Sequence, residues 1–187
     1  DYPIADLVEI IDWTPFFQTW ELSGKYPAIL DDAKVGDAAR SLYNDARAML
    51  DKIVAEKWFK ASAVLGFWPA NAVGDDVHIY ADETRDKPIG VLHGLRQQLS
   101  KREGRANVSI SDFIAPRESG LKDYIGAFTV TAGLGEDVIA ERFKRANDDY
   151  SAIMVKALAD RLAEAFAERL HQNVRKEFWG YAPGETL

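Results

Sequence analysis

Residues 137–176 read DVIAERFKRANDDYSAIMVKALADRLAEAFAERLHQNVRK, and this stretch decides the fold. It contains no proline or glycine, and its apolar residues recur in steps of three and four. Such steps place apolar side chains in one broad stripe on an α-helix. At about 1.5 Å per residue, a helix of this length would extend about 60 Å. The stretch therefore predicts one very long helix that carries the core of the domain.

Three acidic residues, Asp160, Glu164 and Glu168, follow one another at four-residue spacing along this predicted helix. The spacing places them on one side of the helix, at the edge of the apolar stripe. One interpretation is a solvated acidic face with basic residues such as Arg161 nearby. The other is that one of the carboxylates accepts hydrogen bonds from the hydroxyl groups of a ligand. The periodicity does not decide between the two.

The composition is that of an ordinary globular protein. The chain has 187 residues, of which 47% are hydrophobic and 28% charged, so that one domain with one sizeable core is expected. A net charge of −7 argues against nucleic acid or an anionic membrane as the main partner. No apolar run is long enough to span a bilayer, and no signal-peptide pattern is present. These features favour the cytoplasm.

Other features exclude several kinds of site. The chain has no cysteine, which excludes disulfides and thiolate-bound metals. Its three histidines are scattered, so we expect no multi-histidine metal site. No glycine-rich nucleotide-binding motif, phosphate-binding loop or His-Glu-x-x-His sequence occurs.

The N-terminal region contains a second acid of interest. Thr14 followed by Pro15 predicts the N-cap and first turn of a short helix that ends near Leu22. Asp12 stands just before this start, where a carboxylate can cap the exposed backbone N–H groups. A longer amphipathic helix is predicted over residues 36–56.

The strand pattern lies between the predicted helices. Residues 63–68 predict a buried strand, residues 70–75 a turn, and residues 76–81 a strand with one wet face. Residues 88–92 and 123–131 predict two more strands. Because strands and helices do not alternate regularly, the pattern favours an α+β fold with a twisted antiparallel sheet.

Several short stretches carry a family resemblance. In chain order they are 11–17 (IDWTPFF), 24–27 (GKYP), 69–71 (PAN), 74–76 (GDD), 82–85 (DETR), 95–98 (LRQQ), 123–128 (DYIGAF), 155–168 (VKALADRLAEAFAE) and 179–183 (WGYAP). Together they resemble the activation domain of cobalamin-dependent methionine synthase, a methyltransferase. The resemblance covers essentially the whole chain in the order of the family.

This resemblance implies a C-shaped α+β module over residues 1–187 that binds S-adenosylmethionine. In the family, cobalamin is held by another module of the same polypeptide and is occasionally oxidised to inactive cob(II)alamin. The activation domain then presents S-adenosylmethionine to the cobalt, while flavodoxin or another reductase supplies an electron. The expected products are methylcobalamin and S-adenosylhomocysteine. The implied partners are therefore the cobalamin-binding module and a reductase.

The resemblance also implies roles for four residues. Asp12 matches the acid that holds the α-amino group of the ligand, and Glu164 matches the carboxylate that binds its ribose hydroxyls. A carboxylate accepts hydrogen bonds, which suits both an ammonium group and a diol. Lys25 and Asp160 match positions that contact the cobalamin-binding module. No catalytic residue or metal ligand is implied within this chain.

One family segment, Arg-x-x-x-Gly-Tyr-Pro, has no counterpart within residues 1–187. In the family its arginine holds the carboxylate of the ligand. We therefore expect this chain by itself to hold half of the site, to bind S-adenosylmethionine weakly or not at all, and to be inactive.

Two other functions stay open from the sequence. One is a non-catalytic module that docks a corrinoid protein or its reductase. The other is an unrelated hydrolase that uses Asp12 and Glu164 as acid and base, which would require the two carboxyl groups about 5–10 Å apart around a substrate.

Overall fold

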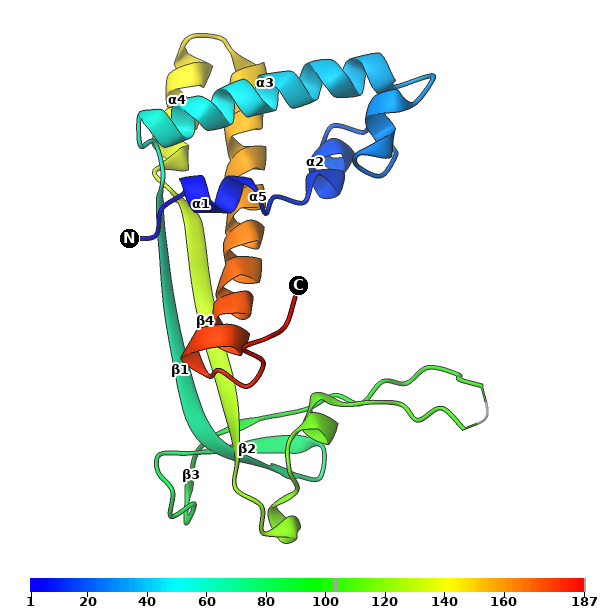
Figure 1. Ribbon diagram of the computed structural model, residues 1–187, viewed down its shortest axis with the longest axis vertical. Helices are drawn as coiled ribbons and strands as arrows, with labels where there is room; N and C mark the ends of the chain where they lie inside the picture. The colour runs from blue at the N-terminus through cyan, green and yellow to red at the C-terminus, as the bar shows by residue number, and fades with distance from the viewer. Residues whose placement is uncertain (103, 187) are drawn as a thin grey trace. The chain divides into compact units, whose positions relative to one another are not determined.

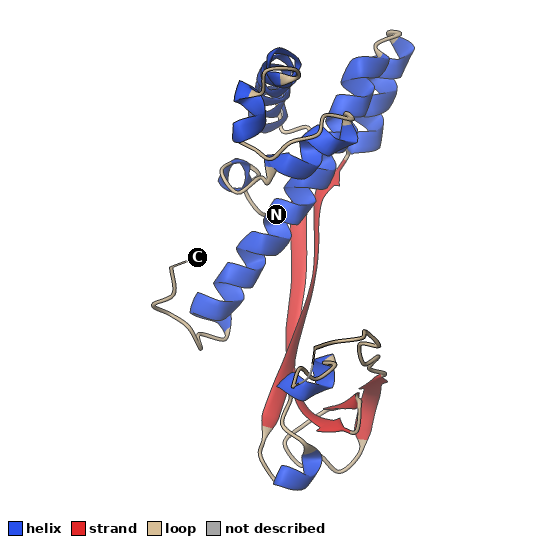
Figure 2. Ribbon diagram, turned by 90° about the vertical axis from the view of Figure 1, so that its right-hand side faces the viewer, coloured by secondary structure: helices blue, strands red, loops and turns tan. Residues whose placement is uncertain are grey.

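The computed structural model describes residues 1–102 and 104–186. The chain divides into two compact units: unit 1 comprises Asp1–Val64 and Thr129–Leu187, and unit 2 comprises Leu65–Phe128. The α-helices of the described residues all belong to unit 1, whereas strands β2 and β3 lie wholly in unit 2. The short helical turns that Figure 2 draws beside these strands are the 3-10 helices of residues 110–113 and 117–119. The expectation of a single domain over residues 1–187 stays a prediction.

Unit 1 is built on five α-helices and two shorter helical turns. They are α1 (Ala5–Val8), α2 (Trp13–Thr19), the 3-10 helix η1 (Ala28–Asp31), α3 (Gly36–Ala55), α4 (Glu136–Arg145), α5 (Asp149–Asn173) and the π-helical turn η4 (Val174–Phe178). Helix α3 crosses α5, and α4 lies beside the N-terminal part of α5 (Figure 1). The amphipathic helix predicted over residues 36–56 is confirmed. None of the described helices is both long and apolar enough to cross a membrane.

The single long helix predicted near residues 137–176 is instead two helices, α4 and α5. Helix α4 ends in a left-handed turn at Asn147, whose φ is 57°. The N–H of Asn147 donates to the carbonyl of Lys144 at 2.9 Å, and the N–H of Asp148 donates to that of Phe143 at 2.9 Å. This pair of bonds closes the helix in a Schellman motif, in which asparagine is one of the few residues that tolerate the left-handed position.

Helix α5 begins directly after this turn. The Asp148 side chain caps it by accepting a hydrogen bond from the backbone N–H of Ser151 at 2.9 Å. This hydrogen bond holds the pKa of the Asp148 carboxyl below its ordinary value. The turn therefore contains both the stop signal of one helix and the start signal of the next.

One antiparallel sheet of four strands is present among the described residues. Its strands are β1 (Lys60–Val73), β2 (Asp76–Tyr80), β3 (Pro88–Leu92) and β4 (Asp123–Leu134), in the order β3-β2-β1-β4. Strand β2 pairs antiparallel with both β1 and β3. The predicted α+β class with an antiparallel sheet and long helices is confirmed.

The first strand differs in detail from its prediction. Strand β1 continues through residues 70–73, which the composition predicted as a turn, and the chain reverses at Gly74 with a φ of 61°. Residues 63–68, predicted as the buried segment, are exposed or half-buried. The buried residues are instead Ala61 near the start of the strand and Ala70, Asn71 and Ala72 near its end. Length and apolar content alone did not show which part of a long strand is covered.

Unit 1 has one continuous hydrophobic core, which holds α2 and α3 against α5. Its most deeply buried large side chains are Leu7, Phe16, Phe17, Ile29, Leu50, Ile53, Met154, Val155, Leu158, Leu162 and Phe166. The aromatic residues Trp13, Phe16 and Phe17 are all buried, and Trp20 is partly buried against this core. Burial of this many large apolar groups is the main source of stability in unit 1.

Unit 2 contains few large buried apolar side chains among its described residues, and polar side chains tie its loops together. The Arg85 guanidinium donates to the carbonyls of Ala70 (3.1 Å) and Asp123 (2.9 Å) and to Asn71 Oδ1 (2.8 Å). Asn71 Nδ2 in turn donates to the carbonyls of two loop residues, Ala115 (3.0 Å) and Leu121 (2.9 Å). Two polar side chains therefore join three segments of unit 2.

A second arginine holds another part of unit 2. The Arg96 guanidinium is shared between Asp75, at 2.6 Å, and Asp112, at 2.7 Å. Asp112 belongs to the 3-10 helix η2 (Ile110–Phe113), where its side chain also accepts from the N–H of Ser109 in a capping box. The segment after β3 that carries Arg96 is irregular, and Arg96 fastens it to Asp75 and Asp112.

Candidate functional site

The two predicted site residues of α5 lie on its solvent side. The helix buries Leu158, Leu162 and Phe166 in the core of unit 1. The side chains of Asp160 and Glu164 are 72% and 55% exposed, respectively. Four-residue spacing on α5 places these two acids one turn apart on the same face, where they are available to a ligand.

A single arginine joins these two acids. Arg161 Nη2 donates to Asp160 Oδ2 at 2.6 Å, and Arg161 Nη1 forms an ion pair with Glu164 Oε2. The arginine side chain itself is only 12% exposed. The sequence alone indicates Arg161 only as one of several basic residues near an acidic face. Its spacing of three from Glu164 was the available signal, because such pairs meet on a helix surface.

Asp12 is the N-cap of α2. Its Oδ1 accepts a hydrogen bond from the backbone N–H of Thr14 at 2.9 Å. The helix therefore begins at Trp13 and not after Thr14, and the capping role considered for Asp12 is confirmed. The residue is exposed, and its Oδ2 has no hydrogen-bond partner among the described residues. A capping role thus leaves one carboxylate oxygen able to accept from a ligand.

Lys25 lies close to the same end of α2. The hydroxyl of Thr14 accepts from the backbone N–H of Tyr26 at 3.2 Å, which ties the segment after Lys25 to the first turn of the helix. The phenol of Tyr26 also contacts that of Tyr43, with 3.4 Å between the oxygens. This hydrogen bond and partial burial raise the pKa of Tyr26. The structure therefore brings Asp12 and the exposed Lys25 to one end of α2.

The chain that carries Asp12 runs along α5 between two contacts. Near one end, Arg169 of α5 donates to the carbonyl of Asp6 at 3.5 Å. Near the other, the rings of Trp20 and Tyr150 lie 5.1 Å apart. The segment between Asp6 and Trp20 thus passes along the middle of α5 in the opposite direction. Asp12 lies in this segment, between the contact with Arg169 and the contact with Tyr150.

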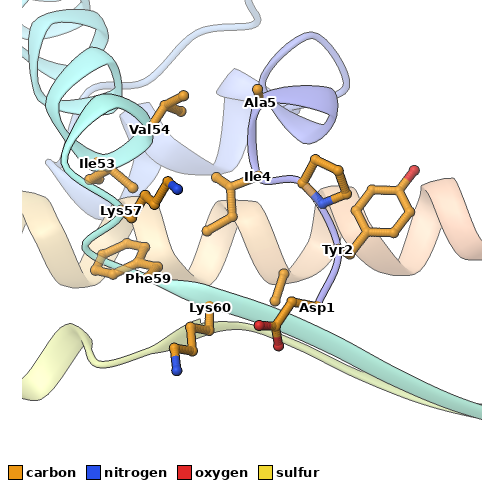
Figure 3. Close-up of a pocket in the computed structure, with 11 residues that line it drawn as sticks. Asp1, Tyr2, Ile4, Ala5, Ile53, Val54, Lys57, Phe59 and Lys60 are labelled. Carbon is orange, nitrogen blue, oxygen red and sulfur yellow. The ribbon is translucent and has the colours of Figure 1, made fainter.

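A cavity of about 430 Å³ opens elsewhere in unit 1 (Figure 3). It is lined by Asp1, Tyr2, Pro3, Ile4, Ala5, Ile53, Val54, Lys57, Phe59, Lys60 and Ala61. None of the four predicted site residues lines this cavity. In residues 1–102 and 104–186, no group of three or more His, Cys, Asp or Glu side chains is placed to hold a metal ion.

Comparison with known proteins identifies the family. Residues 3–187 match the family described as "Vitamin B12 dependent methionine synthase, activation domain". The chain belongs to this family. The resemblance found in the sequence is therefore confirmed over essentially its whole length.

A solved structure agrees with this membership of the methionine synthase activation domains. It is described as "Crystal Structure of the MetH Reactivation Domain bound to AdoHcy" and is 59% identical to this chain, with a TM-score of 0.93. The match covers 100% of this chain and 57% of that one. The α+β fold is thus that of the reactivation domain. The ligand and docking roles of Asp12, Glu164, Lys25 and Asp160 stay predictions.

Proposed function

We propose that this activation domain binds S-adenosylmethionine and serves to reactivate a vitamin B12-dependent methionine synthase. The observation that carries the proposal is the similar structure bound to S-adenosylhomocysteine, the product left when S-adenosylmethionine gives up its methyl group. At 59% identity and a TM-score of 0.93, a shared ligand is the expected outcome. Family membership over residues 3–187 supports the same function.

The chemistry of the proposed ligand contacts fits this molecule. The ammonium group of S-adenosylmethionine needs a hydrogen-bond acceptor, which Asp12 offers through the oxygen that the helix cap leaves free. The ribose diol needs acceptors too, and Glu164 offers a carboxylate of which Oε2 already pairs with Arg161. The exposed face of α5 leaves room for the diol at the other oxygen.

The reactivation itself needs groups outside this chain. When bound by another module of the parent polypeptide, cobalamin would accept the methyl group together with one electron from flavodoxin or another reductase. Lys25 and Asp160 carry opposite charges and are both exposed, which suits contacts with the cobalamin-binding module. We therefore propose that residues 1–187 have no methyl-transfer activity by themselves. The cytoplasmic location likewise stays a prediction.

Calorimetric titration with S-adenosylhomocysteine tests the proposal, in the native protein that contains residues 1–187. We expect Asp12→Asn to weaken binding about 10-fold or more, since a charge-assisted hydrogen bond contributes about 1.5–3 kcal/mol. Asparagine caps helices as well as aspartate does, so the thermal stability should stay unchanged. Glu164→Gln should weaken binding similarly.

A matched control is Asp32→Asn. Asp32 also accepts from two backbone N–H groups, those of Lys34 (2.8 Å) and Val35 (3.0 Å), but it has no proposed ligand contact. Its replacement should leave affinity unchanged. If the unaltered native protein gave no binding heat at millimolar ligand, the proposal would be wrong and a non-catalytic docking module would be the better description.

A further inference from the structure

The side chain of Arg161 is much less exposed to solvent than the two acids that it joins. Both acids are largely exposed, whereas the arginine side chain is almost completely covered. An arginine in such a position cannot exchange freely between solvent and its partners. Its planar fork presents two donors in fixed directions, one toward Asp160 and one toward Glu164.

The pairing leaves part of the Glu164 carboxylate free. Oε2 is taken by Arg161, and no protein hydrogen bond is recorded for Oε1 among the described residues. A carboxylate has about four lone-pair sites, so a paired carboxylate can still accept from two neighbouring hydroxyl groups. Arg161 therefore fixes the orientation of Glu164 without blocking it.

An exposed glutamate without a partner samples several side-chain rotamers and must lose that freedom when it binds a ligand. Pairing with a rigid neighbour removes the freedom before the ligand arrives, which strengthens binding. Asp160, one residue before Arg161, accepts a hydrogen bond from Nη2 of the guanidinium and so restricts its rotation away from Glu164. The three residues act as one unit in which Arg161 is the fixed member.

We propose that Arg161 is a positioning residue that holds Glu164 in the orientation needed to bind the ribose diol of the S-adenosyl ligand. This inference rests on the proposed function. It predicts that loss of Arg161 affects recognition of the ribose hydroxyls and not of the remainder of the ligand.

The test compares S-adenosylhomocysteine with its 2′,3′-dideoxy analogue by calorimetry, in the native protein that contains residues 1–187. The unaltered protein should bind S-adenosylhomocysteine at least about 10-fold more tightly than the analogue, because only the parent ligand has a diol that donates to the Glu164 carboxylate. Arg161→Met should reduce this ratio to about 2-fold while affinity for the analogue changes little. Equal weakening of both ligands would show a merely structural role and overturn the inference.

A double-mutant cycle keeps the test decisive if Arg161→Met fails to fold. Arg161→Lys retains the positive charge but not the planar guanidinium with its two donors. The ratio of the affinities for S-adenosylhomocysteine and the dideoxy analogue should therefore fall about 3-fold. In Glu164→Gln the two ligands should already bind about equally, so adding Arg161→Lys should not change the affinity ratio further. If the two effects simply multiplied, Arg161 would not act through Glu164, and the inference would be wrong.

The matched control is Arg145→Met, which breaks an arginine–glutamate pair with Glu141 on the surface of α4. It should leave both affinities unchanged. A native protein that binds neither ligand would refute the proposed function and this inference together. One that binds both ligands equally would refute only the role of the Glu164–Arg161 pair, and S-adenosyl binding would stand.

Discussion

In unit 1, Phe16, Leu158 and Phe166 are at most 1% exposed and belong to one apolar core. In unit 2, the side chains that join separate segments are instead polar, and Arg85, with only 11% of its side chain exposed, is central among them. Burial of apolar surface is non-directional, whereas a buried guanidinium requires each acceptor at a set distance and angle. The two units should therefore respond differently to substitution.

This difference bears on where function can be placed. The proposed ligand contacts, Asp12 and Glu164, are exposed residues on helices whose opposite faces are buried in the core of unit 1. A rigid apolar core can hold such side chains in place while they remain open to a ligand. In unit 2 the polar side chains of Arg85 and Arg96 are already occupied in holding loops together.

The largest effect is expected from the core of unit 1. Phe166→Ala removes a ring that packs against Tyr2, with 4.6 Å between the ring centroids. Loss of such a buried ring costs about 3–5 kcal/mol. Hydrogen exchange followed by mass spectrometry should show faster exchange throughout the helices of unit 1. Leu95→Ala removes an exposed leucine of unit 2 and serves as the control, with an expected change within about 0.5 kcal/mol.

A smaller effect, confined to the other unit, is expected from Arg85→Met. Methionine fills much of the same space but leaves the carbonyls of Ala70 and Asp123 without their donor. Hydrogen bonds from a charged group contribute about 1.5–3 kcal/mol, and we expect a loss of about 2–3 kcal/mol. Exchange should accelerate in β2 and in the loop that precedes β4. Lys122→Met, which removes an exposed cation of the same unit, should change little. Uniform acceleration of unit 1 would contradict the comparison.

Acid should also weaken unit 2 through one carboxyl, that of Asp112. The hydrogen bond from Arg96, assisted by the N–H of Ser109, lowers the pKa of Asp112 to about 2. An unfolded aspartate titrates near pH 4, so this carboxyl contributes stability above about pH 4 that is lost as the pH falls toward 2. Asp112→Asn should remove that part of the pH dependence. Chemical shifts of unit 2, followed from pH 7 to pH 2 in the unaltered protein and in the variant, would measure the difference.

The smallest effect concerns two tyrosines. Burial and a hydrogen bond to Asp45 raise the pKa of Tyr150 in unit 1 to about 12, with burial the larger cause. In unit 2 the pKa of Tyr124 is raised mainly by its hydrogen bond to Glu83. Asp45→Asn should therefore lower the pKa of Tyr150 only in part, whereas Glu83→Gln should return that of Tyr124 most of the way to its ordinary value. Spectrophotometric titration of the two variants would measure both tyrosine pKa values. Equal decreases in the pKa of Tyr150 and Tyr124 would contradict the difference in cause between them.

Local patterns were sufficient for several elements. Helix α3 and strands β2 and β3 have nearly their predicted bounds because periodicity and turn residues act within a few neighbours. The break at Asn147 was missed because apolar residues continue at helical spacing on both sides of it. Only the left-handed turn and the cap at Asp148, which an asparagine and an aspartate permit but do not require, separate α4 from α5.

The candidate site shows a similar division. Asp12 and Glu164 came from family motifs, and the physical argument alone left each of them open to a plain structural role. The sequence could not show that the Arg161 side chain is largely covered between two exposed acids, because this depends on how the helix packs and on which rotamer the packing allows. It also could not show that Thr14 links Asp12 with the segment of Lys25.

By itself the sequence determined the α+β class, the main helices and strands, and the family, because these follow from local spacing and from motifs that survive as short runs of residues. The tertiary structure decided which part of β1 is buried, where the long helical stretch is interrupted, and which charges pair across a helix turn. The interruption depends on a backbone turn that Asn147 permits but does not require. Burial along β1 depends on contacts between residues distant in the chain, and the charge pairs depend on the rotamers that packing permits. Such contacts are cooperative properties of the folded chain, and no local pattern contains them.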